Sequence, residues 1–134
     1  MTAPDSQKLR VLVADESQIM RRQLGDFVMD APELSLVGMA DSATNALNLF
    51  FQFRPDVVLV SICLPDRNGF DVLQSVKLAE PGCAVILMTK HPNPSIEPTS
   101  QLLGARAVFA KSNSLGGLRE LLVSLLKEKI TDGI

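Results

Sequence analysis

The chain of 134 residues has few of the side chains that build disulfides and soft-metal sites. It contains two cysteines, Cys63 and Cys83, and a single histidine, His91. The cysteines have no C-x-x-C spacing and no histidine cluster nearby, so we expect reduced thiols in a cytoplasmic protein. His91 lies in a proline-rich stretch, where an exposed surface position is expected.

The sequence also lacks long apolar runs and a strong excess of charge. No run approaches the roughly 20 apolar residues that span a membrane, and the N-terminal MTAPDSQKLR lacks the apolar centre of a signal peptide. The formal net charge of −2 gives no overall attraction to nucleic acid or to anionic membranes. We therefore expect a cytoplasmic protein that neither enters a membrane nor binds nucleic acid directly.

The remaining composition is that of an ordinary folded domain. Hydrophobic residues make up 46% of the chain and charged residues 21%, a balance that argues against disorder. A chain of this length has room for one domain and none for a second of ordinary size. A single domain across residues 1–134 is expected.

Short apolar runs alternate with segments of helical period. The expected strands are Arg10–Ala14, Leu34–Ala40, Val57–Ile62, Ala84–Met88 and Ala107–Ala110. The expected helices are Ser17–Met29, a segment after the cap Ser42, a segment near Phe70–Leu78, a short turn toward Gln101–Leu103 and a leucine-striped C-terminal helix. Thr89–Pro98 contains three prolines and is expected to be a loop. This order predicts a doubly wound α/β domain with a five-stranded parallel sheet and helices on both faces.

Polar side chains stand at the ends of four expected strands. Asp15 and Glu16 follow the first strand, and Ser61 lies near the end of the third. Thr89 follows the fourth strand and Lys111 follows the fifth. Because functional groups of such sheets gather at the carboxyl ends of the strands, these side chains are expected to converge on one pocket.

These segments resemble the receiver domain of bacterial response regulators. The similarity rests on VLVADES around Asp15, S-x-x-L-P-x-x-x-G from Ser61 to Gly69, the strand-end Thr89 and AVFAKS around Lys111. It extends over about residues 8–129. The resemblance implies a flavodoxin-like fold and a role in two-component or phosphorelay signalling, with a histidine kinase-like or output protein as partner and no enzymatic activity.

The resemblance also assigns a role to each position. Asp15, Glu16 and the backbone carbonyl of Cys63 correspond to the Mg²⁺ ligands, a set that suits a cation preferring hard oxygen donors. Position 61 corresponds to the aspartate that accepts the phosphoryl group.

The remaining positions correspond to the groups that respond to phosphorylation. Thr89 matches the hydroxyl that binds the phosphoryl group, and Lys111 matches the lysine that pairs with it. Phe109 matches an aromatic residue that rotates with the switch.

Ser61 departs from this pattern. A serine hydroxyl is protonated and needs an adjacent base before it can attack, so Ser61 is not expected to accept phosphate from a kinase. The substitution also removes one carboxylate and is expected to weaken Mg²⁺ binding. Asp66, in the following loop, is a substitute acceptor in principle, although its side chain is expected to point outward.

Lys90 is a second departure, because receivers usually carry a small residue there. It can cover the pocket, pair with Asp15 or Glu16, or extend into solvent, and the sequence leaves all three open. The prolines that follow are expected to shorten or bend the fourth helix. The resemblance implies that this helix, the fifth strand and the last helix form the surface through which a homodimer would assemble. Arg21 and Arg22 either contact a kinase-like partner or face solvent.

The leading interpretation is a signalling module that acts through protein contacts. One alternative is a phosphorylatable regulator whose natural aspartate has been replaced by Ser61. A more distant alternative is a haloacid dehalogenase-like phosphohydrolase, but that chemistry needs a D-x-D pair where this chain has Asp15-Glu16-Ser17. A flavin-binding role is disfavoured because the acidic ADESQIM segment would repel phosphate.

Overall fold

The computed structural model describes residues 7–132, in which five strands alternate with five helices. The strands are β1 (Leu9–Ala14), β2 (Leu34–Ala40), β3 (Val57–Ser61), β4 (Ala84–Thr89) and β5 (Ala107–Ala110). The helices are α1 (Gln18–Asp30), α2 (Ala43–Phe53), α3 (Gly69–Ala79), α4 (Ile96–Leu102) and α5 (Leu115–Asp132). Residues 1–6 and 133–134, which the expected single domain includes, lie outside the described range.

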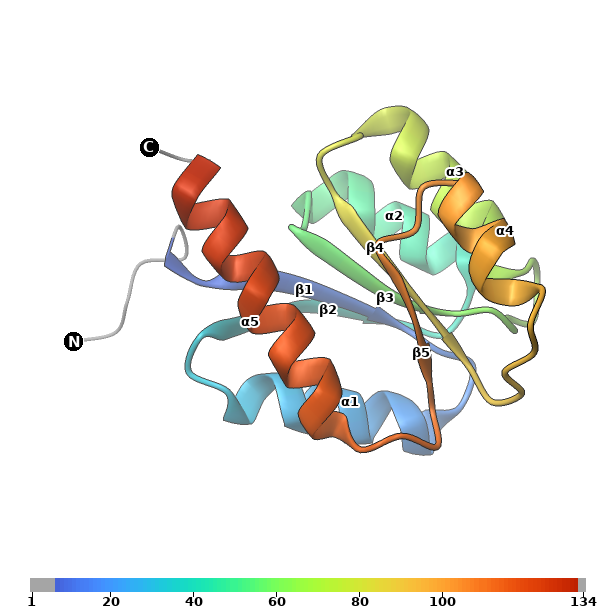
Figure 1. The fold of residues 1–134 in the computed structure, drawn as a ribbon, viewed down its shortest axis with the longest axis horizontal. Coiled ribbons are helices and arrows are strands. Elements are labelled where there is room, and N and C mark those ends of the chain that lie inside the picture. The colour runs from blue at the N-terminus through green and yellow to red at the C-terminus, as the bar shows by residue number, and fades with distance from the viewer. Residues whose placement is uncertain (1–6, 133–134) are drawn as a thin grey trace.

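All five strands pair in parallel, in the order β2-β1-β3-β4-β5. Helices α1 and α5 cover one face of the sheet, and α2, α3 and α4 cover the other (Figure 1). The expected doubly wound, flavodoxin-like fold is confirmed. Strand order reverses between β1 and β3, so their carboxyl ends flank the crevice where such sheets bind ligands.

The sheet is buried on both sides by two apolar layers. All five residues of β3 are buried, as expected for a central parallel strand covered on both faces. Val57 and Leu59 pack toward α1 and α5, while Val58 and Val60 pack toward α2 and α3. The strand ends at Ser61, which therefore lies at the carboxyl edge of the sheet.

Side-chain caps start the first three helices. The Ser17 hydroxyl accepts a hydrogen bond from the Met20 amide at 3.2 Å, and the Ser42 hydroxyl accepts one from the Asn45 amide at 3.1 Å. Both caps were expected from the sequence. Asn68 performs the same function for α3, and its Oδ1 accepts from the Asp71 amide at 3.0 Å.

The prediction for the fourth helix was wrong at its start. A loop was expected through Pro98 with helix only toward Gln101–Leu103, but α4 begins at Ile96 and includes Pro98 as its third residue. The first turn of a helix has amides without a carbonyl partner inside the helix, so a proline there removes no hydrogen bond. The helix is nevertheless short, as the prolines predicted.

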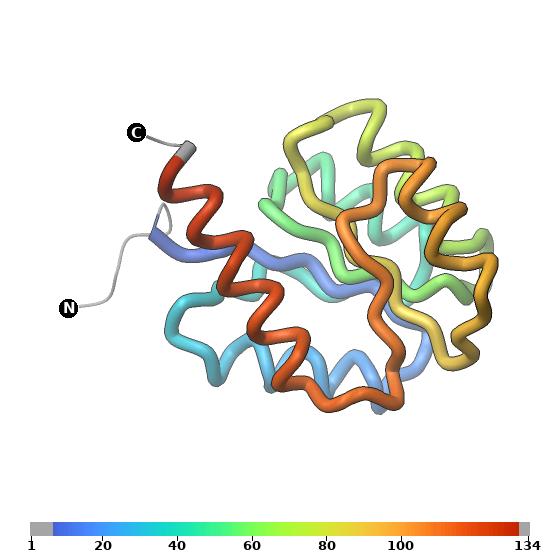
Figure 2. Tube along the Cα trace, viewed as in Figure 1, coloured from blue at the N-terminus to red at the C-terminus, as the bar shows by residue number. Residues whose placement is uncertain are grey.

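The end of α5 is tied to the beginning of β1. Lys129 Nζ donates to the Lys8 carbonyl and contacts Asp56 Oδ2, both at 2.8 Å. The Arg10 amide donates to the same Asp56 oxygen at 2.8 Å. These contacts hold the C-terminal helix beside the first strand (Figure 2).

Both cysteines are free, as expected, but they differ in environment. Cys63 is exposed, whereas Cys83 is buried at the start of β4. Burial disfavours the charged thiolate and raises the pKa of the Cys83 thiol to about 12.

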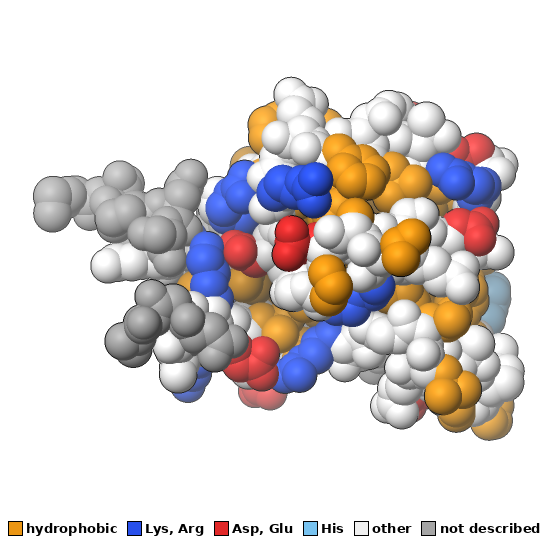
Figure 3. All heavy atoms as spheres, turned by 90° about the horizontal axis from the view of Figure 1, so that it is seen from above, with side chains coloured by type: hydrophobic (Ala, Val, Ile, Leu, Met, Phe, Trp, Pro, Cys, Tyr) orange, Lys and Arg blue, Asp and Glu red, His pale blue; other side chains and the backbone are white. Residues whose placement is uncertain are grey.

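The surface mixes charged and apolar side chains. On the face drawn in Figure 3, acidic and basic groups are interspersed among apolar ones. The most exposed large apolar side chains are Leu78 on α3 and Leu102 on α4, at 89% and 87% exposure. None of the helices within residues 7–132 is long and apolar enough to cross a membrane.

Candidate functional site

A pocket of about 410 Å³ opens at the carboxyl ends of the central strands. Its lining includes six residues that the sequence singled out, namely Glu16, Ser61, Cys63, Thr89, Lys90 and Lys111. They come from four separate segments of the chain. The predicted convergence of the strand ends is therefore present in the structure.

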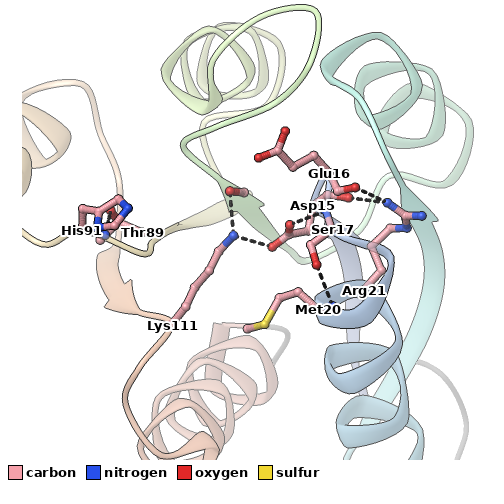
Figure 4. Close-up of polar contacts among 9 residues, drawn as sticks. Asp15, Glu16, Ser17, Met20, Arg21, Thr89, His91 and Lys111 are labelled. Carbon is pink, nitrogen blue, oxygen red and sulfur yellow. Dashed lines mark hydrogen bonds and ion pairs between the residues drawn. The ribbon is translucent and has the colours of Figure 1, made fainter.

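The centre of the site is a buried ion pair that includes the serine. Lys111 Nζ lies 2.7 Å from Asp15 Oδ2 and donates a hydrogen bond to Ser61 Oγ at 2.9 Å (Figure 4). The Asp15 side chain is completely buried and that of Lys111 is 7% exposed. One ammonium thus links the ends of β1, β3 and β5.

Asp15 depends on Lys111 for its second oxygen. Oδ1 accepts a hydrogen bond from the Ser17 amide at 2.9 Å. The contact from Lys111 to Oδ2 is close but lies outside hydrogen-bond alignment, so Oδ2 has no hydrogen-bond partner within the described residues. A buried carboxylate with one cationic partner is costly to leave unpaired.

Arg21 holds the acidic loop from the first turns of α1. Its Nη1 donates to the carbonyl oxygens of Asp15 at 2.8 Å and Glu16 at 3.0 Å (Figure 4). The sequence left open whether Arg21 contacts a partner protein or faces solvent. In the structure its guanidinium binds the backbone carbonyls of the site. Arg22 is exposed. No sequence motif indicated the Arg21 contact, which depends on how α1 turns back over the loop.

Gly69 explains the spacing of the S-x-x-L-P-x-x-x-G motif. The loop after β3 returns to the strand end, where the Gly69 amide donates to the Ile62 carbonyl at 2.7 Å. A Cβ atom at Gly69 would collide with the Ser61 carbonyl oxygen and crowd the Ile62 Cα. The glycine therefore allows α3 to begin in direct contact with the strand that carries Ser61.

Thr89 and the residues after it form another wall of the pocket. Thr89 is 7% exposed, and its Oγ1 accepts from the His91 amide at 3.1 Å. Lys90 is exposed at the rim and forms no ion pair with Asp15 or Glu16 in residues 7–132. The imidazole of His91 belongs to an exposed residue, as expected. Phe109 is 8% exposed and packs into the apolar layer beneath α1 and α5.

Asp66 points away from the pocket and caps α2. Its Oδ1 accepts from the Ala43 amide at 2.8 Å, while Oδ2 accepts from the amide and hydroxyl of Thr44 at 2.9 and 2.8 Å. These hydrogen bonds stabilise the carboxylate and hold the pKa of Asp66 well below its usual range. Its oxygens are engaged in a structural contact, so the structure does not favour Asp66 as a substitute acceptor.

The oxygen donors fit Mg²⁺ only in part. Asp15 Oδ2, the Glu16 carboxylate and the Cys63 carbonyl are hard donors of the kind that Mg²⁺ prefers, and the Cys63 carbonyl accepts no hydrogen bond within the described range. Lys111, however, already neutralises Asp15, and Ser61 supplies a neutral hydroxyl. Residues 7–132 contain no group of three His, Cys, Asp or Glu side chains placed to hold a metal ion.

Residues 11–123 match the family model described as the response regulator receiver domain. The chain belongs to this family. The match runs from within β1 to the middle of α5 and includes every strand end that lines the pocket. The expected resemblance is confirmed at the level of the family, and the dehalogenase alternative is set aside.

Known proteins resemble this receiver domain in sequence and in fold. A protein-glutamate methylesterase/protein-glutamine glutaminase of Shewanella oneidensis is 37% identical over 100 residues, which are 75% of this chain and 28% of that protein. The receiver domain of NarL from Mycobacterium tuberculosis has a TM-score of 0.84 at 26% identity, over 90% of this chain and 97% of that one. A CheY-like receiver of Methanospirillum hungatei reaches a TM-score of 0.85 at 21% identity, over 93% and 98% of the two chains, and shows the shared fold.

This chain thus spans less than a third of the length of its Shewanella relative. Its similarity to that protein covers 100 residues, whereas the receiver match covers residues 11–123.

Proposed function

We propose that residues 1–134 form one receiver domain that signals through protein contacts and takes no phosphoryl group at Ser61. One observation carries the proposal. The buried Ser61 hydroxyl accepts a hydrogen bond from the Lys111 ammonium, and no residue in 7–132 accepts the hydroxyl proton.

Nucleophilic attack by serine requires a base beside the hydroxyl. The group that contacts Ser61 Oγ is an ammonium, which has donors and no lone pair. The Asp15 carboxylate is turned toward Lys111 and the Ser17 amide. Within residues 7–132 the pocket therefore offers no base that could take the proton of the Ser61 hydroxyl.

In this proposal the other receiver positions keep their places without the covalent trigger. Thr89 and Lys111 would contact an oxyanion in the pocket, and Phe109 would report on the packing behind it. Asp15, Glu16 and the Cys63 carbonyl would hold Mg²⁺ weakly, since Ser61 removes a carboxylate. When bound, Mg²⁺ supplies charge neutralisation for phosphate oxygens.

Intact mass spectrometry tests the role of Ser61. The protein and a Ser61→Asp variant are incubated with Mg²⁺ and acetyl phosphate under the same conditions. We expect the variant to gain one phosphoryl group and this chain to gain none, because an aspartate is ionised at neutral pH and needs no base.

A Ser61→Ala variant serves as the control for modification elsewhere. A phosphoryl group on this chain that is lost in Ser61→Ala would refute the proposal. If Ser61→Asp also failed to react, another part of the pocket, Lys90 first, would block phosphorylation as well, and the domain would be a binding module whatever residue stands at position 61.

We further propose a histidine kinase-like or output protein as partner, with homodimers forming through α4, β5 and α5. The support is the exposed Leu102 on α4, the edge position of β5, and the 2.6 Å ion pair between Arg106 and Glu128 that holds α5 beside β5. The net charge of −2 favours protein partners over nucleic acid, and we place the domain in the cytoplasm. The esterase and glutaminase activities of the relatives are not part of this proposal.

The second candidate is a phosphorylatable regulator in which Ser61 replaces a natural aspartate. It is favoured by the convergence of Asp15, Thr89 and Lys111 around position 61, which suits a carboxylate phosphoacceptor. The natural gene sequence at codon 61 separates the two candidates directly.

A further inference from the structure

We infer that helix α1 carries a self-complementary surface through which two copies of this chain pair, with their α1 helices antiparallel. The surface consists of four residues, Ile19, Arg22, Asp26 and Met29, which we call the α1 stripe. It lies on a different element from the α4-β5-α5 surface. The inference goes beyond the proposed function and does not depend on the state of Ser61.

The α1 stripe is one continuous line of side chains on the outer side of the helix. Its residues are spaced by three, four and three positions, which keeps them on one face of an α-helix and is the spacing of contact residues between paired helices. All four are exposed, whereas Leu24 and Val28, on the opposite face of α1, are buried. The stripe therefore faces away from the core, on a helix that lies at the lower edge of the molecule in Figure 1.

The two ends of the stripe are apolar and open to solvent. Ile19 is 73% exposed and Met29 is 62% exposed. Met29 also lines a hollow of about 290 Å³ beside the helix, together with Met39 of β2, which is 46% exposed. Single exposed apolar residues are common on folded proteins, but Ile19 and Met29 stand at symmetric positions around a charged centre.

That centre carries one charge of each sign. Arg22 and Asp26 are four residues apart, a spacing at which opposite charges can pair within one helix. In residues 7–132 they form no ion pair with each other or with any other side chain. Both charges are therefore available to a second molecule.

Antiparallel pairing of two stripes matches every position. A twofold axis through the middle of the stripe places Ile19 opposite the second copy's Met29, and Arg22 opposite its Asp26. The symmetry repeats both contacts, so the interface has two apolar pairs and two ion pairs. Parallel pairing would place like charges opposite each other, which repel. The order of the charges thus selects a second, antiparallel copy of this chain as the occupant.

The interface is small, so the dimer should be weak. A helix of 13 residues is about 20 Å long and about 10 Å across, and two such faces bury less than the roughly 1,600 Å² of a standard protein interface. We expect reversible dimers in the upper micromolar to millimolar range. A second copy covers Arg22, so dimerisation and the binding of another protein to this face of α1 exclude one another.

Amide NMR tests the inference and locates the association. The ¹⁵N-labelled protein is diluted from millimolar to low micromolar concentration, and we expect concentration-dependent shifts in α1. Shifts confined to α4, β5 and α5 would report the other surface and overturn the inference. Absence of any shift in α1 would also overturn it and would leave the stripe to a different protein.

Charge reversal tests the pairing itself. Arg22→Asp makes both charges of the stripe acidic, and Asp26→Arg makes both basic. Each variant alone should self-associate through α1 at least about tenfold more weakly, because both ion pairs become repulsive. The double variant Arg22→Asp/Asp26→Arg should associate like the parent. Arg67→Asp, at an exposed position in the β3–α3 loop, is the control and should leave the α1 shifts unchanged.

The mixture of the two single variants is the most specific test. Labelled Arg22→Asp titrated with unlabelled Asp26→Arg should show saturable shifts in α1, since every charge then faces its opposite. No shift in this mixture, undiminished self-association of either single variant, or an equal loss in Arg67→Asp would each overturn the inference. Unchanged signals from the buried strands verify that each variant is folded.

The result is separable from the proposed function. Intact mass measured on the same samples after treatment with Mg²⁺ and acetyl phosphate reports on Ser61 alone. A phosphoryl adduct at Ser61 would contradict the proposed function and leave the pairing through α1 standing. Loss of the α1 shifts without an adduct would do the reverse.

Discussion

At position 111, one ammonium contacts two buried oxygens from different strands, Asp15 Oδ2 and Ser61 Oγ. Lys111→Met keeps the apolar stem and removes the charge, which leaves the fully buried Asp15 without its cation. Breaking a buried pair in this way costs about 3–5 kcal/mol. We expect a loss of that size in the free energy of unfolding, measured by urea denaturation at pH 7.

Lys90→Met is the matched control, because Lys90 is exposed and has no ion pair among residues 7–132. It should change stability by less than about 0.5 kcal/mol. Adding Asp15→Asn to Lys111→Met should recover part of the loss. Equal stability of the two lysine variants would show that the Asp15–Lys111 pair is not a stabilising contact.

The sequence predicted the residues of the site better than their partners. Asp15, Ser61, Thr89 and Lys111 were identified from their places at strand ends, which parallel topology brings together. Lys111 as the joint partner of Asp15 and Ser61 was not predicted, nor was the contact of Arg21 with the acidic loop. Such contacts depend on distances across the sheet and on the turn into α1, which residue patterns do not encode.

At the scale of elements, the start of α3 depends on one glycine. In Gly69→Ala the added methyl group meets the Ser61 carbonyl, and the clash is with backbone that cannot rotate away. We expect a loss of about 1–3 kcal/mol in urea denaturation, the usual cost of overpacking.

Gly117→Ala is the control of opposite sign. Gly117 lies in α5 with nothing near its missing Cβ, so alanine there should stabilise the helix by up to about 1 kcal/mol. Loss of stability in Gly117→Ala, or none in Gly69→Ala, would contradict this account of the motif.

The start of α2 depends on a carboxylate from the β3–α3 loop. Hydrogen bonds from Ala43 and Thr44 hold the pKa of Asp66 below its ordinary value of 3.8. A depressed folded-state pKa means that the carboxylate stabilises the fold fully above that ordinary value, and less as the pH falls toward the folded-state pKa. Asp66→Ala should therefore be less stable than the parent at pH 7, and the difference should shrink below pH 3.8.

Urea denaturation from pH 7 down to the acid limit of the native state measures this difference. Glu120→Gln, at an exposed acidic residue of α5, is the control and should show no comparable pH-dependent difference. A gap between parent and Asp66→Ala that stays constant with pH would exclude the cap as its cause.

Strands were easier to predict than the fourth helix. β2 and β5 have the predicted bounds, and the other strands differ by one residue at one end. A buried parallel strand is a continuous apolar run, so the ends of the run mark both ends of the strand. α4 was misplaced because three nearby prolines suggested a loop, although a proline within the first helical turn costs no hydrogen bond.

At the scale of the whole molecule, position 61 determines how far a metal ion can stabilise the fold. A ligand that binds only the folded state raises stability according to its affinity. Ser61→Asp adds a carboxylate near the oxygens of Asp15, Glu16 and Cys63. We expect millimolar Mg²⁺ to raise the thermal midpoint of Ser61→Asp more than that of this chain, measured by circular dichroism.

Each thermal midpoint in Mg²⁺ is compared with the midpoint of the same protein in Ca²⁺-free buffer with EDTA. Ser61→Asn is the control, because asparagine has the shape of aspartate without its charge. Ser61→Asn should respond to Mg²⁺ like the parent. An equal shift for all three proteins would mean that position 61 has no influence on the metal site.

The Asp15–Lys111 contact also has a consequence for the order in which the chain folds. The pair joins the end of β1 to the end of β5, with β3 and β4 between these strands. Closing so long a loop costs more entropy than closing a local one, so the pair should form after the central strands have assembled. In stopped-flow measurements, Lys111→Met should accelerate unfolding while leaving the refolding rate nearly unchanged. The contact would then set how long the native state persists, and not how quickly it is reached.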